Sequence, residues 1–104
     1  MRGMFYGCSS LKELNLSIFN TNNITDMNKM FCQCESLEIL NIYSFNTENV
    51  LDMSYMFYKC SSLKELNLSN FNTKKIYDMS SMFNGYSDEL IEKIKEQNKN
   101  IKIE

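Results

Sequence analysis

The chain repeats one pattern of apolar and polar positions every 26 residues. The pair Met-Phe opens each copy, at Met4, Met30, Met56 and Met82. Inside a copy, Leu11, Leu14 and Leu16 follow the spacing L-x-x-L-x-L, in which the last two leucines alternate with a polar residue. Alternation with a period of two is typical of a short strand that buries one face. We therefore expect one strand in each copy. The regular period predicts that successive copies stack on one another.

A second apolar stripe follows the strand in each copy. Its members are spaced by three, three and one residues in the first copy: Ile24, Met27, Met30 and Phe31. This spacing indicates a short helix. The asparagine-rich run 20–23 favours a turn before it, and Asp26 stands where a helix N-cap is expected. We therefore expect an α/β solenoid with short parallel strands stacked one per 26-residue coil, and short helices on the other face.

The repeat and its C-terminal end define the domain organisation. We expect a repeat array over residues 1–86 and a C-terminal cap over residues 87–104. The array divides into a partial coil 1–3, full coils 4–29, 30–55 and 56–81, and a partial coil 82–86. In the cap, Ser87 and the stripe Leu90, Ile91 and Ile94 indicate a capping helix. The alternation over 101–103 then indicates a short edge strand.

The chain is expected to begin inside one of the repeat helices, because 1–3 correspond to 27–29 in the repeat. The strand at 11–16 is therefore expected to lack a neighbour on its N-terminal side, as in a fragment of a longer array. An unpaired strand edge attracts further strands. We expect self-association through this open edge, or fraying of residues 1–10.

The repeat resembles a known family. The pattern M-F-x-x-C-x-S-L-x-x-L-N-L-S-x-F-N-T-x-x-I-x-D-M-S resembles the BspA-like leucine-rich repeats, in the variety of mycoplasma lipoproteins and protist surface proteins known as a domain of unknown function. The resemblance covers residues 1 to about 86 and implies a leucine-rich-repeat solenoid, a role in adhesion or partner binding, and a cell-surface or secreted location. Phe19, Phe45 and Phe71 stand where many leucine-rich repeats have Asn or Cys. We therefore expect a phenylalanine spine in place of an asparagine ladder.

Composition and charge narrow the functional classes. A length of 104 residues fits one domain. The 11 basic and 13 acidic residues give a net charge of −2, which argues against a nucleic-acid partner. Histidine is absent, and no Gly-rich phosphate loop or nucleophile motif is present, so we expect neither enzymatic activity nor a cofactor. No apolar run reaches the eighteen or so residues that cross a bilayer, so we expect no membrane insertion by this chain.

The sulfur residues offer an alternative function. Cys8, Cys34 and Cys60 occupy one column, and we expect buried, reduced thiols there because parallel side chains do not converge into a disulfide. Cys32 lies outside the column and is expected to be more accessible. Cys32, Cys34 and the methionine columns could together form a thiolate and thioether metal site. Cys32-Gln-Cys34 lacks the second pair of a tetrahedral zinc site, and the methionine spacing favours core packing, so we expect no metal ligands.

The outward positions of the strands hold the candidate binding residues. With Leu40 and Ile42 turned inward, Ile39, Asn41 and Tyr43 face outward on the concave side. The flanking coils are polar at the matching positions Glu13, Asn15, Glu65 and Asn67. An apolar pair with a polar rim is typical of an interface anchor, although strand preference alone also favours Ile and Tyr here. We expect a non-catalytic module that binds a protein or glycan partner through this face; a metal-binding module and a purely structural spacer are the alternatives.

Overall fold

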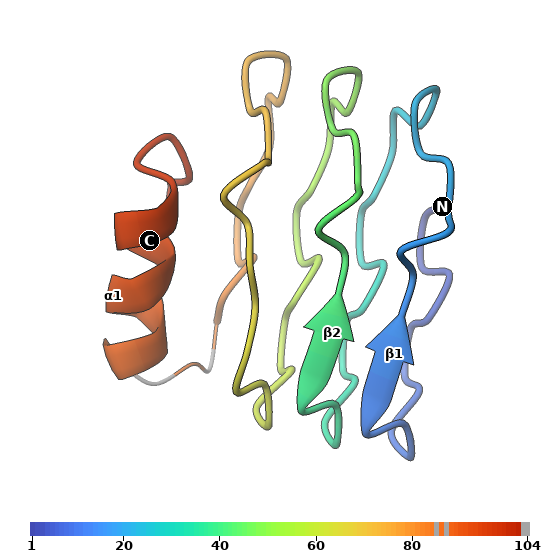
Figure 1. Cartoon of the computed structure of the whole chain (residues 1–104), viewed down its shortest axis with the longest axis vertical. Coiled ribbons are helices and arrows are strands. Elements are labelled where there is room, and N and C mark those ends of the chain that lie inside the picture. Colours follow the sequence, from blue (N-terminus) through green and yellow to red (C-terminus); the bar gives the residue numbers. More distant parts are fainter. Residues whose placement is uncertain (85, 87, 103–104) are drawn as a thin grey trace.

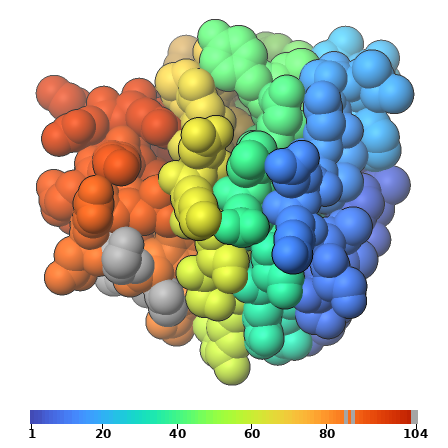
Figure 2. Space-filling view, turned by 60° about the horizontal axis from the view of Figure 1, so that its bottom comes forward, coloured from blue at the N-terminus to red at the C-terminus, as the bar shows by residue number. Residues whose placement is uncertain are grey.

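The computed structural model describes residues 1–84, 86 and 88–102, and in it successive copies of the repeat lie side by side. Figure 1 shows the copies in chain order, with the N-terminal copy at one end and the helix α1 (Asp88–Gln97) at the other. The strands β1 (Glu13–Asn15) and β2 (Ile39–Asn41) pair in parallel, so that Leu14 is opposite Leu40. The colour bands of Figure 2 follow one another in the same order, so each copy borders the copies next to it.

Corresponding positions of the three full copies are in register on both layers of the molecule. On the strand side, β2 continues to the third copy only through the isolated parallel bridge between Ile39 and Glu65. On the opposite side, Asp26 bridges Asp52, and Asp52 bridges Asp78. The sequence predicts one strand per copy, but within the described residues the third copy has this bridge in place of a strand. The period of 26 residues nevertheless sets the register.

The short helices expected on the second layer are replaced by consecutive turns. The Met30 N–H donates to the Met27 carbonyl oxygen at 3.2 Å, and the Cys34 N–H donates to the Phe31 carbonyl oxygen at 3.2 Å. The third residues of these turns, Lys29 and Gln33, have φ values of 58° and 63°. A positive φ at the third position is the feature of a type II turn. We call the layer formed by residues 1–8, 27–34, 53–60 and 79–84 the turn face.

Hydrogen bonds between copies explain why turns replace helices. The N–H groups that are not bonded within a turn donate to backbone carbonyl oxygens of the next copy. These bonds run from Met27 to Asp52, from Lys29 to Ser54 and from Phe31 to Met56, at 3.0–3.1 Å. In a helix the same groups would bond within their own segment. The apolar spacing of three, three and one residues fits both arrangements, since a turn also returns the chain after three residues. The stacking of copies therefore decides between them.

The aspartate column forms turns and not the expected helix caps. The Asp26 carboxylate accepts the Asn28 N–H at 2.9 Å. Asp78 accepts both the N–H and the hydroxyl of Ser80, at 2.9 and 2.7 Å, and these hydrogen bonds hold the pKa of the Asp78 carboxyl below its usual value. A carboxylate bonded to the N–H two residues on is an Asx turn. The column therefore fixes the start of each turn segment.

The positive φ values predict a stabilising substitution. Gln33 lies in the same repeat column as Gly7, which has a φ of 71°. A residue with a side chain at positive φ is strained by about 1–2 kcal/mol, which glycine avoids at some cost in chain entropy. Gln33→Gly should therefore raise the free energy of unfolding by about 0.5–1 kcal/mol in urea denaturation. Glu35→Gly, outside the positive-φ positions, should lower it; a loss of stability in both variants would contradict the turn geometry.

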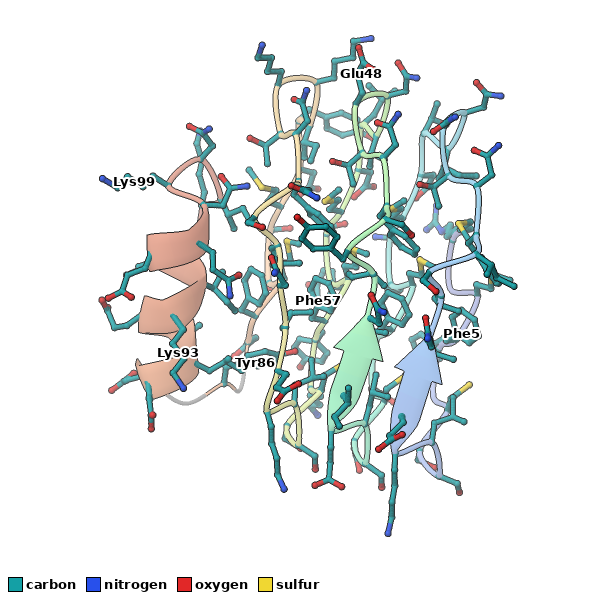
Figure 3. All side chains as sticks on the ribbon, in the orientation of Figure 1. Phe5, Glu48, Phe57, Tyr86, Lys93 and Lys99 are labelled. Atoms are coloured by element: carbon teal, nitrogen blue, oxygen red, sulfur yellow. The ribbon has the colours of Figure 1, made fainter. Side chains whose placement is uncertain are left out.

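Phenylalanine rings form the centre of the core. Phe5, Phe31, Phe57 and Phe83 are stacked, with ring centroids 5.7, 5.8 and 5.6 Å apart and interplanar angles of 3°, 6° and 13°. Figure 3 shows Phe5 and Phe57 between the two layers. Of the residues expected to form the spine, Phe45 and Phe71 are buried and Phe19 is half-buried. The rings that stack within the described residues thus belong to the Met-Phe column and not to the predicted one.

The two ends of the array differ. Phe5, Cys8 and Leu14 are half-buried in the first copy, whereas their equivalents Phe31, Cys34 and Leu40 in the second are buried. β1 pairs with β2 along one edge, and no other described strand pairs with it. Within the described residues, the outer edge of β1 therefore has no strand beside it, and the expected self-association or fraying at this edge stays a prediction.

At the other end, side-chain amides from the end of α1 close the array. Gln97 accepts the Leu68 N–H at 3.0 Å and donates to the Leu66 carbonyl oxygen at 3.1 Å. Asn98 donates to the carbonyl oxygens of Leu68 and Phe71 at 3.1 and 2.9 Å. These amides supply the partners that a further copy of the repeat would offer. The backbone groups of Leu66, Leu68 and Phe71 at the edge of the third copy thus have partners in the cap.

The cap differs in detail from the sequence expectation. The helix is present as α1 and buries Ile94, as the apolar stripe predicts. The expected edge strand is not formed by its described part, although Ile101 is buried in the core. Ser87, expected to cap the helix, and residues 103–104, including the end of the expected strand, lie outside the described residues.

Candidate functional site

A groove on the strand side is the candidate functional site. It has a volume of about 590 Å³ and lies between the second and third copies and α1. Its lining includes Ile39 and Tyr43 from the second copy, Glu65 from the third, and Leu90 and Lys93 from α1. In Figure 3, which is viewed from the side of β2, Lys93 lies on the part of α1 that faces the viewer. A volume of this size is within the range of sites that bind ligands.

The apolar floor of the groove comes from the second copy. Ile39 is 40% exposed and Tyr43 is 55% exposed, whereas Leu40 and Ile42 are buried. For Ile39 and Leu40 the alternation follows from the geometry of β2, which turns successive side chains to opposite faces, whereas Tyr43 lies in the turn after β2. The corresponding positions in the flanking copies are exposed and polar. Burial in the core therefore does not explain the two apolar side chains.

The structure brings five of the seven predicted binding residues to the groove. Ile39, Asn41, Tyr43, Glu65 and Asn67 line it. The remaining two, Glu13 and Asn15, lie on β1, where they pair with Ile39 and Asn41 in the sheet register. They extend the same face beyond the groove.

The asparagines of this face are held by their own backbone. The Asn41 side-chain oxygen accepts the Tyr43 N–H at 3.2 Å, and the Asn67 oxygen accepts the Ser69 N–H at 3.0 Å. Asn15 makes the same bond to Ser17 at 2.9 Å. Each oxygen is therefore engaged in an Asx turn that ends the strand segment. These residues contribute to the shape of the groove more than to its free hydrogen-bonding capacity.

The wall that α1 supplies was not predicted from the sequence. Leu90, Lys93 and Gln97 line the groove and are separated by three and four positions, which places them on one face of a helix. This spacing was visible in the sequence. What the spacing could not show is that the helix packs beside the third copy with this face toward the strands.

Charged side chains border the groove and are partly paired. Lys64 lies 2.6 Å from Glu38, and this pair is exposed to solvent. The hydrogen bond and the charge of Lys64 lower the pKa of Glu38, while Glu38 raises the pKa of Lys64. Lys93 lies 3.5 Å from Glu89 on α1. Lys64 and Lys93 at the border thus form ion pairs with carboxylates that lie outside the groove floor.

The thiols are placed differently from the expectation for Cys32. Cys34 and Cys60 are buried, free thiols, as predicted, and they donate to the carbonyl oxygens of Phe5 and Phe31 at 3.1 and 2.9 Å. Cys8 is free but only half-buried. Cys32 is 2% exposed, so its expected accessibility is wrong. Among residues 1–84, 86 and 88–102, no three His, Cys, Asp or Glu side chains are grouped to hold a metal ion.

The buried thiols predict a loss of stability at alkaline pH. Burial raises the pKa of Cys32, and the Cys34 thiol together with burial raises the pKa of Cys60, while the hydrogen bond from Cys60 lowers the pKa of Cys34. The prediction therefore rests on Cys32 and Cys60, whose neutral forms the fold favours. A thiol in the unfolded chain ionises near pH 8.5. The stability that these neutral thiols contribute is therefore fully present below about pH 8.5 and is lost as the pH rises further.

Urea denaturation between pH 7 and pH 10 should show this loss. The slope of the free energy of unfolding against pH should be smaller in the double variant Cys32→Ala with Cys60→Ala. A matched variant, Cys8→Ala, should keep most of the slope. If the unchanged chain and both variants lose stability equally as the pH rises, the buried thiols are not the cause of the loss.

Comparison with known families identifies the chain. Residues 1–101 match the family described as Mycoplasma protein of unknown function, DUF285. The chain belongs to this family. No curated protein and no solved structure matches it. The DUF285 match agrees with the mycoplasma-type repeat predicted from the sequence, while the family description assigns no activity. Within the described residues, no helix of this DUF285 chain has the length and apolar character that crossing a membrane requires.

Proposed function

We propose that this DUF285 domain is a non-catalytic interaction module that binds a protein or glycan partner through the groove between the second copy and α1. The observation that supports it is the exposed pair Ile39 and Tyr43 on the groove floor, at 40% and 55% exposure. Exposed apolar side chains inside a polar rim are the usual anchor of an interface. The shape, with a wall on one side from α1, restricts how a partner can approach.

The proposal includes the relation to BspA-like leucine-rich repeats. The copies lie in register at intervals of 26 residues, β1 and β2 are parallel, and apolar columns face inward. These features support an α/β leucine-rich-repeat solenoid of an unusual kind, with turns on the second layer. Under this reading, binding on the strand face and a place at the cell surface follow by analogy with that family.

The alternatives have weaker support. A thiolate and thioether metal site would need Cys32 and Cys34 to reach a shared ion, yet both side chains are buried and Cys34 is hydrogen-bonded to Phe5. A purely structural spacer accounts for Ile39 by strand preference, but leaves the exposed Tyr43 in the turn after β2 without a reason. Self-association through the open edge of β1 uses a different surface from the groove.

Binder selection with matched variants tests the proposal. Binders are selected from a displayed peptide library on the folded chain, and their affinities are compared with the double variant Ile39→Thr with Tyr43→Ser. Threonine keeps the β-branched shape of the strand, so stability should change by less than about 1 kcal/mol. Loss of the anchor should cost about 2 kcal/mol or more of binding free energy.

The chain offers a control outside the groove. Ile18 is 90% exposed and Tyr77 is 75% exposed, and neither lines the groove. Ile18→Thr with Tyr77→Ser makes the same chemical change and should leave the affinities unaltered. Undiminished binding by the groove variant, or equal losses in both variants, would refute the groove as the binding site.

A further inference from the structure

Three residues in register form a row across the strand face. Glu13 pairs with Ile39 in the sheet, and Ile39 bridges Glu65. All three side chains are exposed. Because neighbouring strands lie about 4.8 Å apart, the row places one apolar side chain between two carboxylates at close range.

The nearby lysines are engaged with other carboxylates. Lys64 pairs with Glu38 at 2.6 Å, and the charge of Lys12 also acts on Glu38. Lys93 pairs with Glu89 at 3.5 Å. Among the described residues, the ion pairs within 4 Å include neither Glu13 nor Glu65. The charged side chains of this face therefore separate into a paired border and an acidic row without an ion pair among the described residues.

We propose that the groove binds a protein segment in which basic residues flank an apolar residue; this rests on the proposed function and specifies its partner. The apolar side chain packs on Ile39 and Tyr43, where Leu90 of α1 forms the facing wall. The flanking ammonium or guanidinium groups pair with Glu13 and Glu65. Charge complementarity selects this partner: an acidic segment meets like charges, and a neutral glycan offers no cation for the carboxylates.

Two synthetic peptides of equal length test the charge pattern. They share one framework and differ only at the centre, which reads Arg-Phe-Arg in one and Glu-Phe-Glu in the other. NMR titration of the full chain at low salt should show binding of the Arg-Phe-Arg peptide, with affinity that falls as salt is added. The Glu-Phe-Glu peptide should bind at least about tenfold more weakly. Equal affinities, or no binding of the Arg-Phe-Arg peptide, would overturn the inference.

A charge variant and its control separate this inference from the proposed function. Glu13→Gln with Glu65→Gln should weaken binding of the Arg-Phe-Arg peptide about fivefold and reduce its salt dependence. Glu35→Gln with Glu48→Gln changes two exposed carboxylates elsewhere, one of them the labelled Glu48 of Figure 3, and should have no effect. If the Ile39 and Tyr43 variant loses its selected binders but the Glu13 and Glu65 variant binds this peptide normally, the groove stands and the basic partner is wrong.

Discussion

Replacing Phe57 with alanine should lower the free energy of unfolding by about 4 kcal/mol. Phe57 is fully buried and stacks on both Phe31 and Phe83, at 5.8 and 5.6 Å. Truncation removes the ring from two neighbours at once and leaves a cavity between adjacent copies. A domain of this size is stable by only about 5–15 kcal/mol, so the variant should be close to unfolding at room temperature. Urea denaturation followed by circular dichroism measures the effect.

The same column supplies the control. Phe5 has one stacked neighbour, Phe31, and is half-buried because the first copy is open on its outer side. Phe5→Ala should therefore cost about half as much as Phe57→Ala. Equal costs would show that the first copy is as enclosed as the third, and a cost below about 1 kcal/mol for Phe57→Ala would contradict the stacked core.

Asn98→Asp should lower the free energy of unfolding by about 3–5 kcal/mol at pH 7. Asn98 is buried, and its amide donates to the carbonyl oxygens of Leu68 and Phe71. A carboxylate has no proton to donate, so it would face two acceptors without solvent. The backbone edge of the third copy would lose its cap, and α1 should detach. Hydrogen exchange of α1 and denaturation curves both report this.

Two further variants separate charge from contact. Asn98→Ala removes the donors without adding a charge and should cost about 1–3 kcal/mol. Asn100→Asp, at an exposed site two residues on, should change stability by less than about 0.5 kcal/mol. Burial would raise the pKa of the carboxyl introduced by Asn98→Asp, so its penalty should be smallest below about pH 4 and grow as the pH rises. A penalty independent of pH would argue against a buried charge.

The repeat made much of the fold predictable. Because the period places Leu14 and Leu40 in one column, it predicts that they lie side by side, and they are opposite each other in the sheet. The interior columns need only apolar periodicity, which the sequence displays directly. The helix of the cap also follows from the sequence, because the repeat pattern gives way to an amphipathic stripe there.

The second layer was not predictable from spacing alone. Met27, Met30 and Phe31 suit one face of a helix and equally suit consecutive turns. The outcome depends on hydrogen bonds to residues 25 positions away, such as the bond from Phe31 to Met56. The spacing of apolar residues within one copy does not show whether the N–H groups bond within their own segment or to the next copy. The glycines at positions 3 and 7, which share columns with Lys29 and Gln33, were the available signal for positive φ.

The candidate site was predictable on one side only. The departure of Ile39 and Tyr43 from the polar pattern of the flanking copies pointed to the groove floor. The wall from α1 depends on how the cap packs, which Gln97 and Asn98 fix through bonds to Leu66, Leu68 and Phe71. Amide side chains in a polar terminal run carry no sign of such partners in the sequence.

Mapping a selected binder on the full chain by NMR tests the central claim most directly. The claim is that a partner binds in the groove formed by the second copy and α1. The largest shift changes should then fall on Ile39, Tyr43 and Leu90. The turn face provides the contrasting surface, where the ring centroids of Tyr55 and Tyr58 lie 5.3 Å apart. Shift changes centred on Tyr55 and Tyr58, with Ile39 and Tyr43 unaffected, would place binding on the turn face and contradict the account.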